Sequence, residues 1–199
     1  MRVLDAGSGI GGSSRYLAHT YGCRIQAIDL TSQLVEAAVR LNKLCGIDSM
    51  IAVRQGSVTA LPYEDRSFDV VWSQNVSMNV EDKRRMFAEA YRVLTPGGRY
   101  AMSDAARGPS GEPYYPLPWA KEPSYSFLGT REEILELLAS VGFTRIECRD
   151  ETSQGPGELS PDTILGADMP ERQANAARSG KEGRLVRMFV LAQRPHDSR

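Results

Sequence analysis

Near its start the chain reads Val3-Leu4-Asp5-Ala6-Gly7-Ser8-Gly9-Ile10-Gly11-Gly12. Residues 3–6 are typical of a short buried strand, and the glycine cluster after them spells the pattern G-x-G-x-x-G. Ser13 or Ser14 can then cap a helix that runs to about Thr20. A glycine-rich turn between a strand and a helix lets a nucleotide approach the backbone closely. We therefore predict a nucleotide-type ligand at this turn.

Two aspartates flank the turn and narrow the choice of ligand. Asp29 closes a second predicted strand, at the position from which a carboxylate holds ribose hydroxyls. Asp5 precedes Gly7 by two residues, where its charge would repel a phosphate and attract an ammonium group. The pair favours an adenosine ligand with a cationic amino-acid tail over a dinucleotide.

Strand-like and helix-like segments alternate along the rest of the chain. Apolar residues recur at helical spacing after Asp29, before the turn Thr95-Pro96-Gly97-Gly98 and after Thr130, and a short helix is expected at 170–178. Thr130 and Glu133 form a capping box at a helix start. This alternation predicts an α/β protein with a mainly parallel sheet, folded as one domain over residues 1–199. The further predicted strands are residues 23–28, 50–54, 68–72, 99–103, 143–148 and 185–191.

Residues 105–129 interrupt the alternation. This stretch contains five of the 11 prolines of the chain, together with several aromatic residues that include Trp119. Long connections without a regular pattern are usually functional covers or disordered segments, and the aromatic content favours an ordered cover. We predict that residues 105–129 cover the substrate.

Composition excludes several classes of protein. Hydrophobic residues make up 41% and charged residues 25% of the 199 residues, as in a globular protein, and the net charge of −1 gives no basic surplus for nucleic acid. No apolar run is long enough to span a membrane or to form a signal peptide. Three cysteines without C-x-x-C spacing and two histidines predict neither a disulfide framework nor a metal site. A cytoplasmic location is expected.

The motifs together resemble those of the class I S-adenosylmethionine-dependent methyltransferases. The resemblance begins at residues 3–11 and continues at Asp29-Leu30, Gly56-Ser57, residues 68–72 and the L-x-P-G-G turn at 94–98. Residues 72–75 and Pro118-Trp119 look most like the small-molecule enzymes of methyltransferase type 11, such as the sarcosine/dimethylglycine and quinone-biosynthesis methyltransferases. The resemblance implies a Rossmann-like sheet of seven strands with helices on both faces, the last strand running antiparallel beside the fifth.

The resemblance also implies roles for individual residues, with S-adenosylmethionine as cofactor. Asp5 and the glycine turn would face its methionine part, Asp29 its ribose, and Leu30 its adenine. Ser57 stands where many relatives carry Asp, so a backbone amide at Val58 would serve the adenine instead. The implied cofactor residues are Asp5, Gly7, Ser8, Gly9, Gly11, Asp29, Leu30, Ser57, Val58 and Gln74, and the implied acceptor residues are Asn75, Met78 and Trp119.

Several alternatives stay open at this point. The acceptor is a small molecule with an amine, a phenol or quinol, or an acidic carbon, and no catalytic base is assigned. Relatives usually carry cap helices before the first strand, whereas this sequence begins on that strand. One alternative is therefore an inactive or partner-dependent cofactor-binding subunit, and another is an NAD(P)-dependent oxidoreductase. A homodimer is possible.

Overall fold

The computed structural model describes residues 1–152 and 168–197. The single domain expected over residues 1–199 stays a prediction. Seven strands form one sheet in the order β3-β2-β1-β4-β5-β7-β6, with β7 antiparallel to both β5 and β6. The predicted sheet, with its antiparallel last strand beside the fifth, is confirmed. The strands are β1 Arg2–Ala6, β2 Arg24–Asp29, β3 Ile51–Gln55, β4 Phe68–Gln74, β5 Leu94–Arg107, β6 Thr144–Asp150 and β7 Leu185–Gln193.

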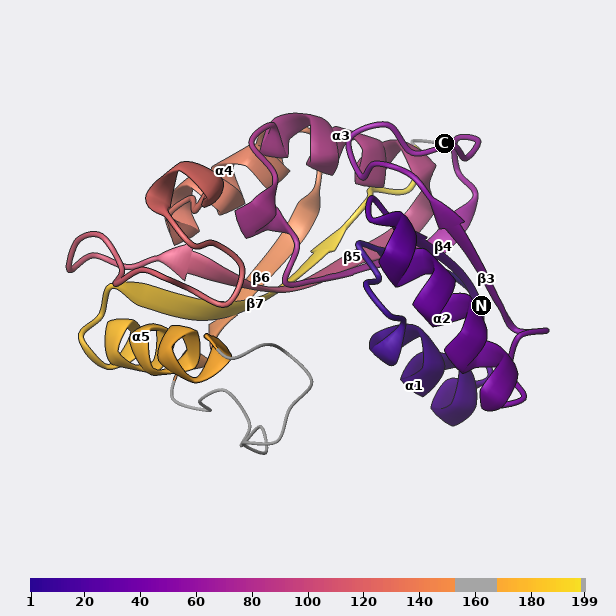
Figure 1. Cartoon of the computed structure of the whole chain (residues 1–199). Helices are drawn as coiled ribbons and strands as arrows, with labels where there is room; N and C mark the ends of the chain where they lie inside the picture. Colours follow the sequence, from indigo (N-terminus) through magenta and orange to yellow (C-terminus); the bar gives the residue numbers. More distant parts are fainter. Residues whose placement is uncertain (153–167, 198–199) are drawn as a thin grey trace.

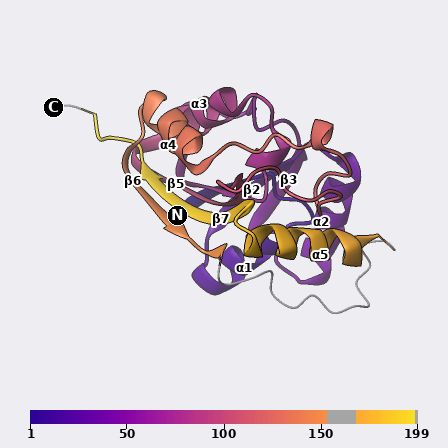
Figure 2. The ribbon, with the colours of Figure 1, turned by 90° about the vertical axis from the view of Figure 1, so that its left-hand side faces the viewer.

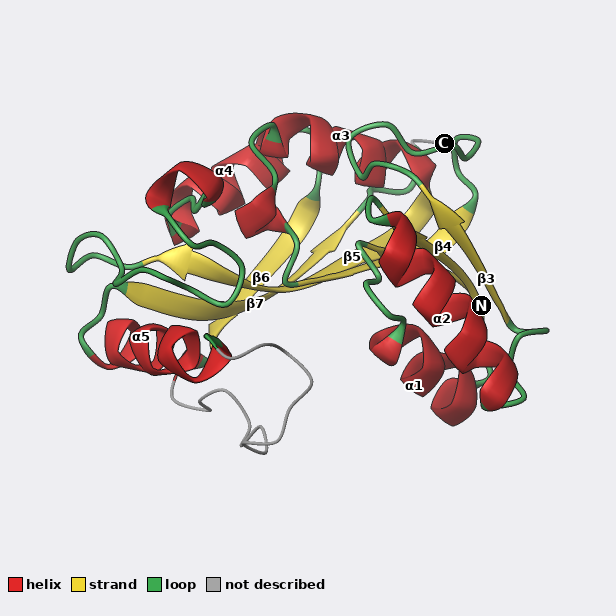
Figure 3. Cartoon of the chain, in the orientation of Figure 1, coloured by secondary structure: helices red, strands yellow, loops and turns green. Residues whose placement is uncertain are grey.

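Helices cover both faces of the sheet (Figures 1 and 3). Figure 2 shows α3 and α4 on one face and α1 and α5 on the other, and Figure 1 places α2 beside α1. Among the described residues, no helix has both the length and the apolar character needed to cross a bilayer. The helices are α1 Gly12–Tyr21, α2 Ser32–Leu44, α3 Lys83–Val93, α4 Arg131–Ser140 and α5 Met169–Lys181, with short 3-10 turns η1 Ser77–Asn79 and η2 Pro123–Tyr125.

Alternate residues of the central strands enter two hydrophobic cores. Leu4 and Ile28 join the larger core, in which Phe87 and Tyr100 pack edge to face beneath α3 and α4. Val3 belongs to the smaller core on the α1 side. The cores hold the central strands from both faces, so their carboxyl ends form a fixed edge.

Two local predictions at helix starts had different outcomes. The capping box at α4 is confirmed, because Thr130 Oγ1 accepts from Glu133 N while Glu133 Oε2 accepts from Thr130 N. The cap at α1 was wrong, since the helix begins at Gly12 behind a left-handed Gly11 and has no side-chain cap. Ser14 is buried in the first turn, where its hydroxyl is bonded to the side chain of Asp5.

The fifth strand is longer than the prediction of 99–103. It runs from Leu94, through an irregular start that includes the predicted turn at 95–98, to Arg107. Ala105, Ala106 and Arg107 pair with β7, so the connection to α4 begins at residue 108. This connection, residues 108–129, is hereafter the β5–α4 segment. It lies against α5, where Asn175 Nδ2 donates to Pro116 O at 3.1 Å.

Candidate cofactor site

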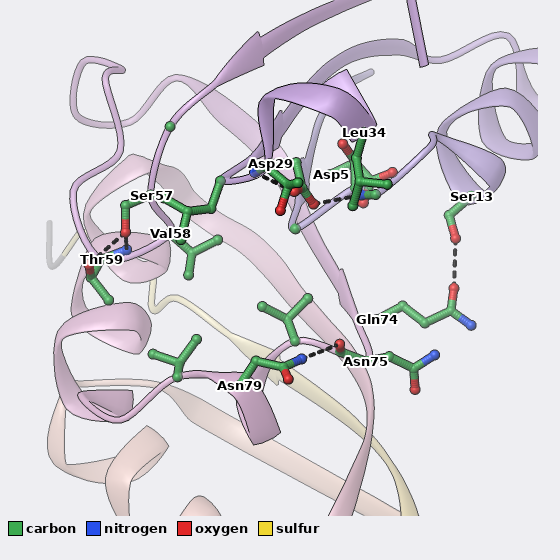
Figure 4. A pocket seen from close by; sticks show the side chains of 18 of the residues that line it. Asp5, Ser13, Asp29, Leu34, Ser57, Val58, Thr59, Gln74, Asn75 and Asn79 are labelled. Carbon is green, nitrogen blue, oxygen red and sulfur yellow. Dashed lines mark hydrogen bonds between the residues drawn. The ribbon is translucent and has the colours of Figure 1, made fainter. Parts of the chain in front are cut away.

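A cavity of about 770 Å³ opens where β1, β2, β3 and β4 end (Figure 4). Its size falls within the usual range of roughly 300–1,000 Å³ for small-molecule sites, and its place at the carboxyl ends of the strands is that of ligands in open α/β sheets. The residues that line it are Asp5, Gly7, Ser8, Gly9, Gly12, Ser13, Asp29, Leu30, Thr31, Leu34, Gly56, Ser57, Val58, Thr59, Gln74, Asn75, Val76, Asn79, Val80, Glu81 and Asp82.

The glycine turn is closed tightly onto β2. The amides of Gly7 and Ser8 both donate to Ile28 O at 2.9 Å. Gly7 has a φ of +85°, and a Cβ there would lie 2.4 Å from Val76 Cγ2. Gly9 has a φ of +53°, and nothing lies within 4 Å of where its Cβ would be. The turn therefore exposes bare backbone to the cavity, as a ligand that lies against it requires.

Asp29 joins the turn to the end of β2. Its Oδ2 accepts from Gly9 N at 2.8 Å and its Oδ1 accepts from Thr31 N at 2.9 Å. Each carboxylate oxygen has a further lone pair, so Asp29 can accept two hydroxyl groups without losing either backbone bond. This geometry agrees with the predicted contact to a ribose.

Asp5 lies deeper, with 2% of its surface exposed. Ser14 Oγ donates to its Oδ2 at 2.5 Å. Burial raises the pKa of Asp5 to about 6 and the charge of Asp29 adds to the rise, whereas the hydrogen bonds from Ser14 oppose it. A cation beside Asp5 would relieve this cost, so the carboxylate is suited to an ammonium group of a ligand.

The opposite wall comes from the end of β4 and the connection after it (Figure 4). Ser13 Oγ donates to Gln74 Oε1 at 2.6 Å, which links this wall to α1. Asn75 has a φ of +56°, and its backbone N–H donates to Ser103 O at 2.9 Å. Asn79 Nδ2 donates to Asn75 O at 3.3 Å. The side-chain amides therefore lie across the cavity from the acidic pair.

The third side follows β3. Ser57 Oγ and Thr59 Oγ1 are 2.8 Å apart, and Thr59 N donates to Ser57 Oγ at 3.2 Å. Leu30, after β2, leaves 69% of its surface exposed at the cavity. The side chain of Ser57 is thus hydrogen-bonded within the 57–59 turn. The adenine contacts implied for Leu30 and Val58 stay predictions.

This one cavity is lined by most of the cofactor and acceptor residues that the resemblance implied. Gly11, Met78 and Trp119 do not line it. Gly11 is the cap of α1, and a Cβ there would meet Arg15 and Ala38. Met78 is buried in η1, and Trp119 donates through Nε1 to Ser126 Oγ at 3.0 Å. The roles assigned to these three stay predictions. The members present are Asp5, Gly7, Ser8, Gly9, Asp29, Leu30, Ser57, Val58, Gln74 and Asn75.

Sequence reasoning missed part of the wall after β4. Asp82 caps α3 by accepting from Arg85 N at 2.9 Å, a signal that a search for helix starts could have found. Glu81, Asn79 and Val80 follow no motif and reach the cavity only because η1 turns the chain back. The cavity thus has four carboxylates, from Asp5, Asp29, Glu81 and Asp82, and the residues that line it include no lysine, arginine or histidine.

An orphaned polar atom indicates where a ligand fits. Ser8 Oγ is buried at the cavity, and the described residues give it no hydrogen-bond partner. An unsatisfied buried hydroxyl costs about 1–3 kcal/mol, which a ligand could recover. With the bare turn and the acidic pair, these residues fit an adenosyl ligand that carries a cationic amino-acid tail. Sheet and site together define the class I methyltransferase fold.

Comparison with known proteins agrees with this class. Residues 4–102 match the model of the methyltransferase domain family, and the chain belongs to that family. It is 36% identical over 154 residues to the sarcosine/dimethylglycine N-methyltransferase of Halorhodospira halochloris, covering 77% of this chain and 55% of the relative. It is 34% identical to the glycine/sarcosine/dimethylglycine N-methyltransferase of Actinopolyspora halophila, in a match that covers 75% of this chain and 26% of the relative. The chain therefore spans about half or less of these relatives.

A solved structure shares the fold over nearly the whole chain. The phosphoethanolamine N-methyltransferase 2 of Haemonchus contortus, solved in complex with S-adenosyl-L-methionine, superposes with a TM-score of 0.80 at 21% identity. The match covers 98% of this chain and 49% of that protein.

Proposed function

We propose that this chain binds S-adenosylmethionine in the cavity and directs its methyl group to a small-molecule amine. The observation that carries the proposal is the acidic pair, Asp5 and Asp29, over a glycine turn whose backbone faces the cavity. Asp5 would hold the ammonium group, Asp29 the ribose hydroxyls, and Leu30 the adenine. A dinucleotide cofactor is disfavoured, because its phosphates would meet the charge of Asp5.

Positioning accounts for much of the catalysis in this proposal. The sulfonium of the bound cofactor supplies a methyl group already activated for displacement. The task of the chain is to hold the acceptor in line with that methyl group and to exclude water. An amine that arrives neutral needs no base, which agrees with the absence of histidine among the residues lining the cavity.

The charge of the cavity supports an amine over a phenolate or a carbanion. In amine methylation, one positive charge leaves sulfur and appears on nitrogen, so the carboxylates stabilise the site before and after transfer. An anionic nucleophile would instead be repelled by Asp5, Asp29, Glu81 and Asp82. The relatives that share 34–36% identity are named for N-methylation of glycine derivatives, which also supports an amine.

Calorimetric titration with S-adenosylhomocysteine tests the cofactor. We expect micromolar affinity and a loss of at least tenfold in Asp29→Ala, because two ligand hydrogen bonds and two loop bonds disappear. Asp48→Ala, at an exposed aspartate of the loop before β3, is the matched control and should bind normally. Binding of NADH but not of S-adenosylhomocysteine would refute the proposal and restore the oxidoreductase alternative.

The acceptor class is tested separately with radiolabelled cofactor and matched sets of amines, phenols and phosphorylated amines. We expect transfer to the amines and little transfer to the phenols or the phosphorylated amines. Binding of the cofactor without transfer to any set would favour the partner-dependent subunit. A homodimer stays a prediction, which sedimentation velocity of the same sample checks.

A further inference from the structure

Lys83, the first residue of α3, is a buried cation outside the cofactor cavity. It is 8% exposed, and in the described part of the chain no carboxylate forms an ion pair with it. Its Nζ donates to Val80 O at 2.7 Å and also to Phe127 O. Burial lowers the pKa of Lys83, while Asp104 and Glu133 raise it. A charge that is costly to bury is thus held mainly by two backbone carbonyls.

Phe127 belongs to the β5–α4 segment and is held on both sides. Its amide donates to Met78 O at 2.8 Å, and its carbonyl accepts from Lys83. The preceding residue, Ser126, accepts from Trp119 Nε1 at 3.0 Å. A continuous set of bonds therefore leads from Lys83 through Phe127 to the indole ring of Trp119.

The wall to which Phe127 is fastened is itself rigid. Asp104 is 1% exposed, and its carboxylate accepts from Val76 N at 2.7 Å and from Ser77 N at 2.9 Å. These bonds fix the start of η1 on β5. Val76, Asn79 and Val80 from the same stretch line the cavity. The β5–α4 segment is consequently anchored to the cavity wall itself.

We propose that Lys83 is a positioning residue, which holds the β5–α4 segment and Trp119 beside the cavity on the acceptor side. The inference rests on the proposed function, because that function gives the segment an acceptor to contact. Lys83 acts through backbone carbonyls and touches neither cofactor nor acceptor. Its loss should loosen the segment at Phe127 and leave the acidic pair and the glycine turn in place.

The test is Lys83→Met, which keeps the apolar stem and removes the donors, in a Trp72→Phe background where Trp119 is the sole tryptophan. We expect acrylamide quenching of Trp119 to rise about twofold or more and trypsin to cleave faster at the exposed Lys121. The affinity for S-adenosylhomocysteine should stay within about twofold. Lys43→Met, at an exposed lysine of α2, is the matched control and should change none of these readouts.

Lys83→Gln guards against a Met variant that does not fold. Glutamine keeps a polar head but is too short to reach both carbonyls, so the same changes in quenching and cleavage are expected. Once acceptors are identified, both variants should raise the acceptor KM more than they lower kcat. Unchanged quenching and cleavage in folded variants would overturn the role of Lys83. Failure of the parent chain to bind S-adenosylhomocysteine would defeat the proposed function, whereas quenching and cleavage would still decide whether Lys83 holds the segment.

Discussion

At the scale of single residues, the charge of Asp5 lowers the stability of the unliganded fold but suits a cationic ligand. Its burial raises its pKa to about 6 from the ordinary value of 3.8. Between these values the folded chain binds more protons than the unfolded chain, so the free energy of unfolding falls as pH rises. The stabilising contribution is complete below pH 3.8 and lost as pH rises through 6. At neutral pH the unliganded protein therefore retains a destabilising charge in the place where a cationic ligand would bind.

Asp5→Asn should consequently stabilise the unliganded chain at pH 7.5. The shift of about 2 pKa units sets an upper bound of about 3 kcal/mol, and the amide oxygen of the substituted side chain can still accept from Ser14. The gain should shrink as pH falls and vanish near pH 4. Urea unfolding of both proteins between pH 4 and 8 measures it, with the exposed Asp48→Asn as control. A difference that does not change with pH would contradict this account.

The sequence predicts those parts of the site that lie in a contiguous motif or at the end of a predicted strand. The acidic pair and the glycine turn occupy strand ends and a contiguous motif, so their neighbourhood follows from the topology of parallel strands. The bond between Ser14 and Asp5 was missed, because capping and inward-facing serines look alike at a helix start. Lys83 and Asp104 were missed for another reason: a buried charge cannot be told from an exposed one without knowing which distant chain covers it.

At the scale of elements, the β1–α1 connection requires a glycine at position 7 but not at position 12. Gly7→Ala combines a φ of +85° with a Cβ at 2.4 Å from Val76 Cγ2, which should cost about 2–4 kcal/mol. Gly12→Ala places a methyl group in open space at the first residue of α1 and should stabilise the chain by at most about 0.5–1 kcal/mol. Thermal and urea unfolding compare the two. An equal change of stability in the two variants would mean that the side chain of Val76 moves aside without cost.

The length of β5 could not be predicted from local sequence, although the order of strands and helices could. The alternation of strands and helices followed from periodicity, and the capping box at α4 followed from two residues three positions apart. The extension of β5 to Arg107 could not be predicted in this way. It depends on pairing with Leu185–Arg187 in β7, about 80 residues later, because a long-range ladder satisfies backbone groups that the local sequence marks as loop.

At the scale of the whole molecule, the cavity and the contacts of Arg194 with the end of α3 lie at opposite ends of the sheet. The cavity follows the carboxyl ends of β1, β2, β3 and β4. At the other end, Arg194 follows β7 and reaches the last turn of α3, where its Nη1 donates to Tyr91 O, Arg92 O and Leu94 O at 2.8, 3.0 and 2.8 Å. A cation there satisfies the free carbonyls of the helix end and complements its dipole.

Arg194→Met should therefore weaken the fold without changing the site. Removing a charged donor from three carbonyls at a partly buried position should cost about 2–3 kcal/mol of unfolding free energy. The affinity for S-adenosylhomocysteine should stay within about twofold, because no residue of the cavity contacts Arg194 through a hydrogen bond. Arg40→Met, at an exposed arginine of α2, should change stability by no more than about 0.5 kcal/mol. Urea unfolding and calorimetry on the three proteins separate the effects, and a loss of affinity in Arg194→Met that matches its loss of stability would show that the two ends are coupled through the sheet.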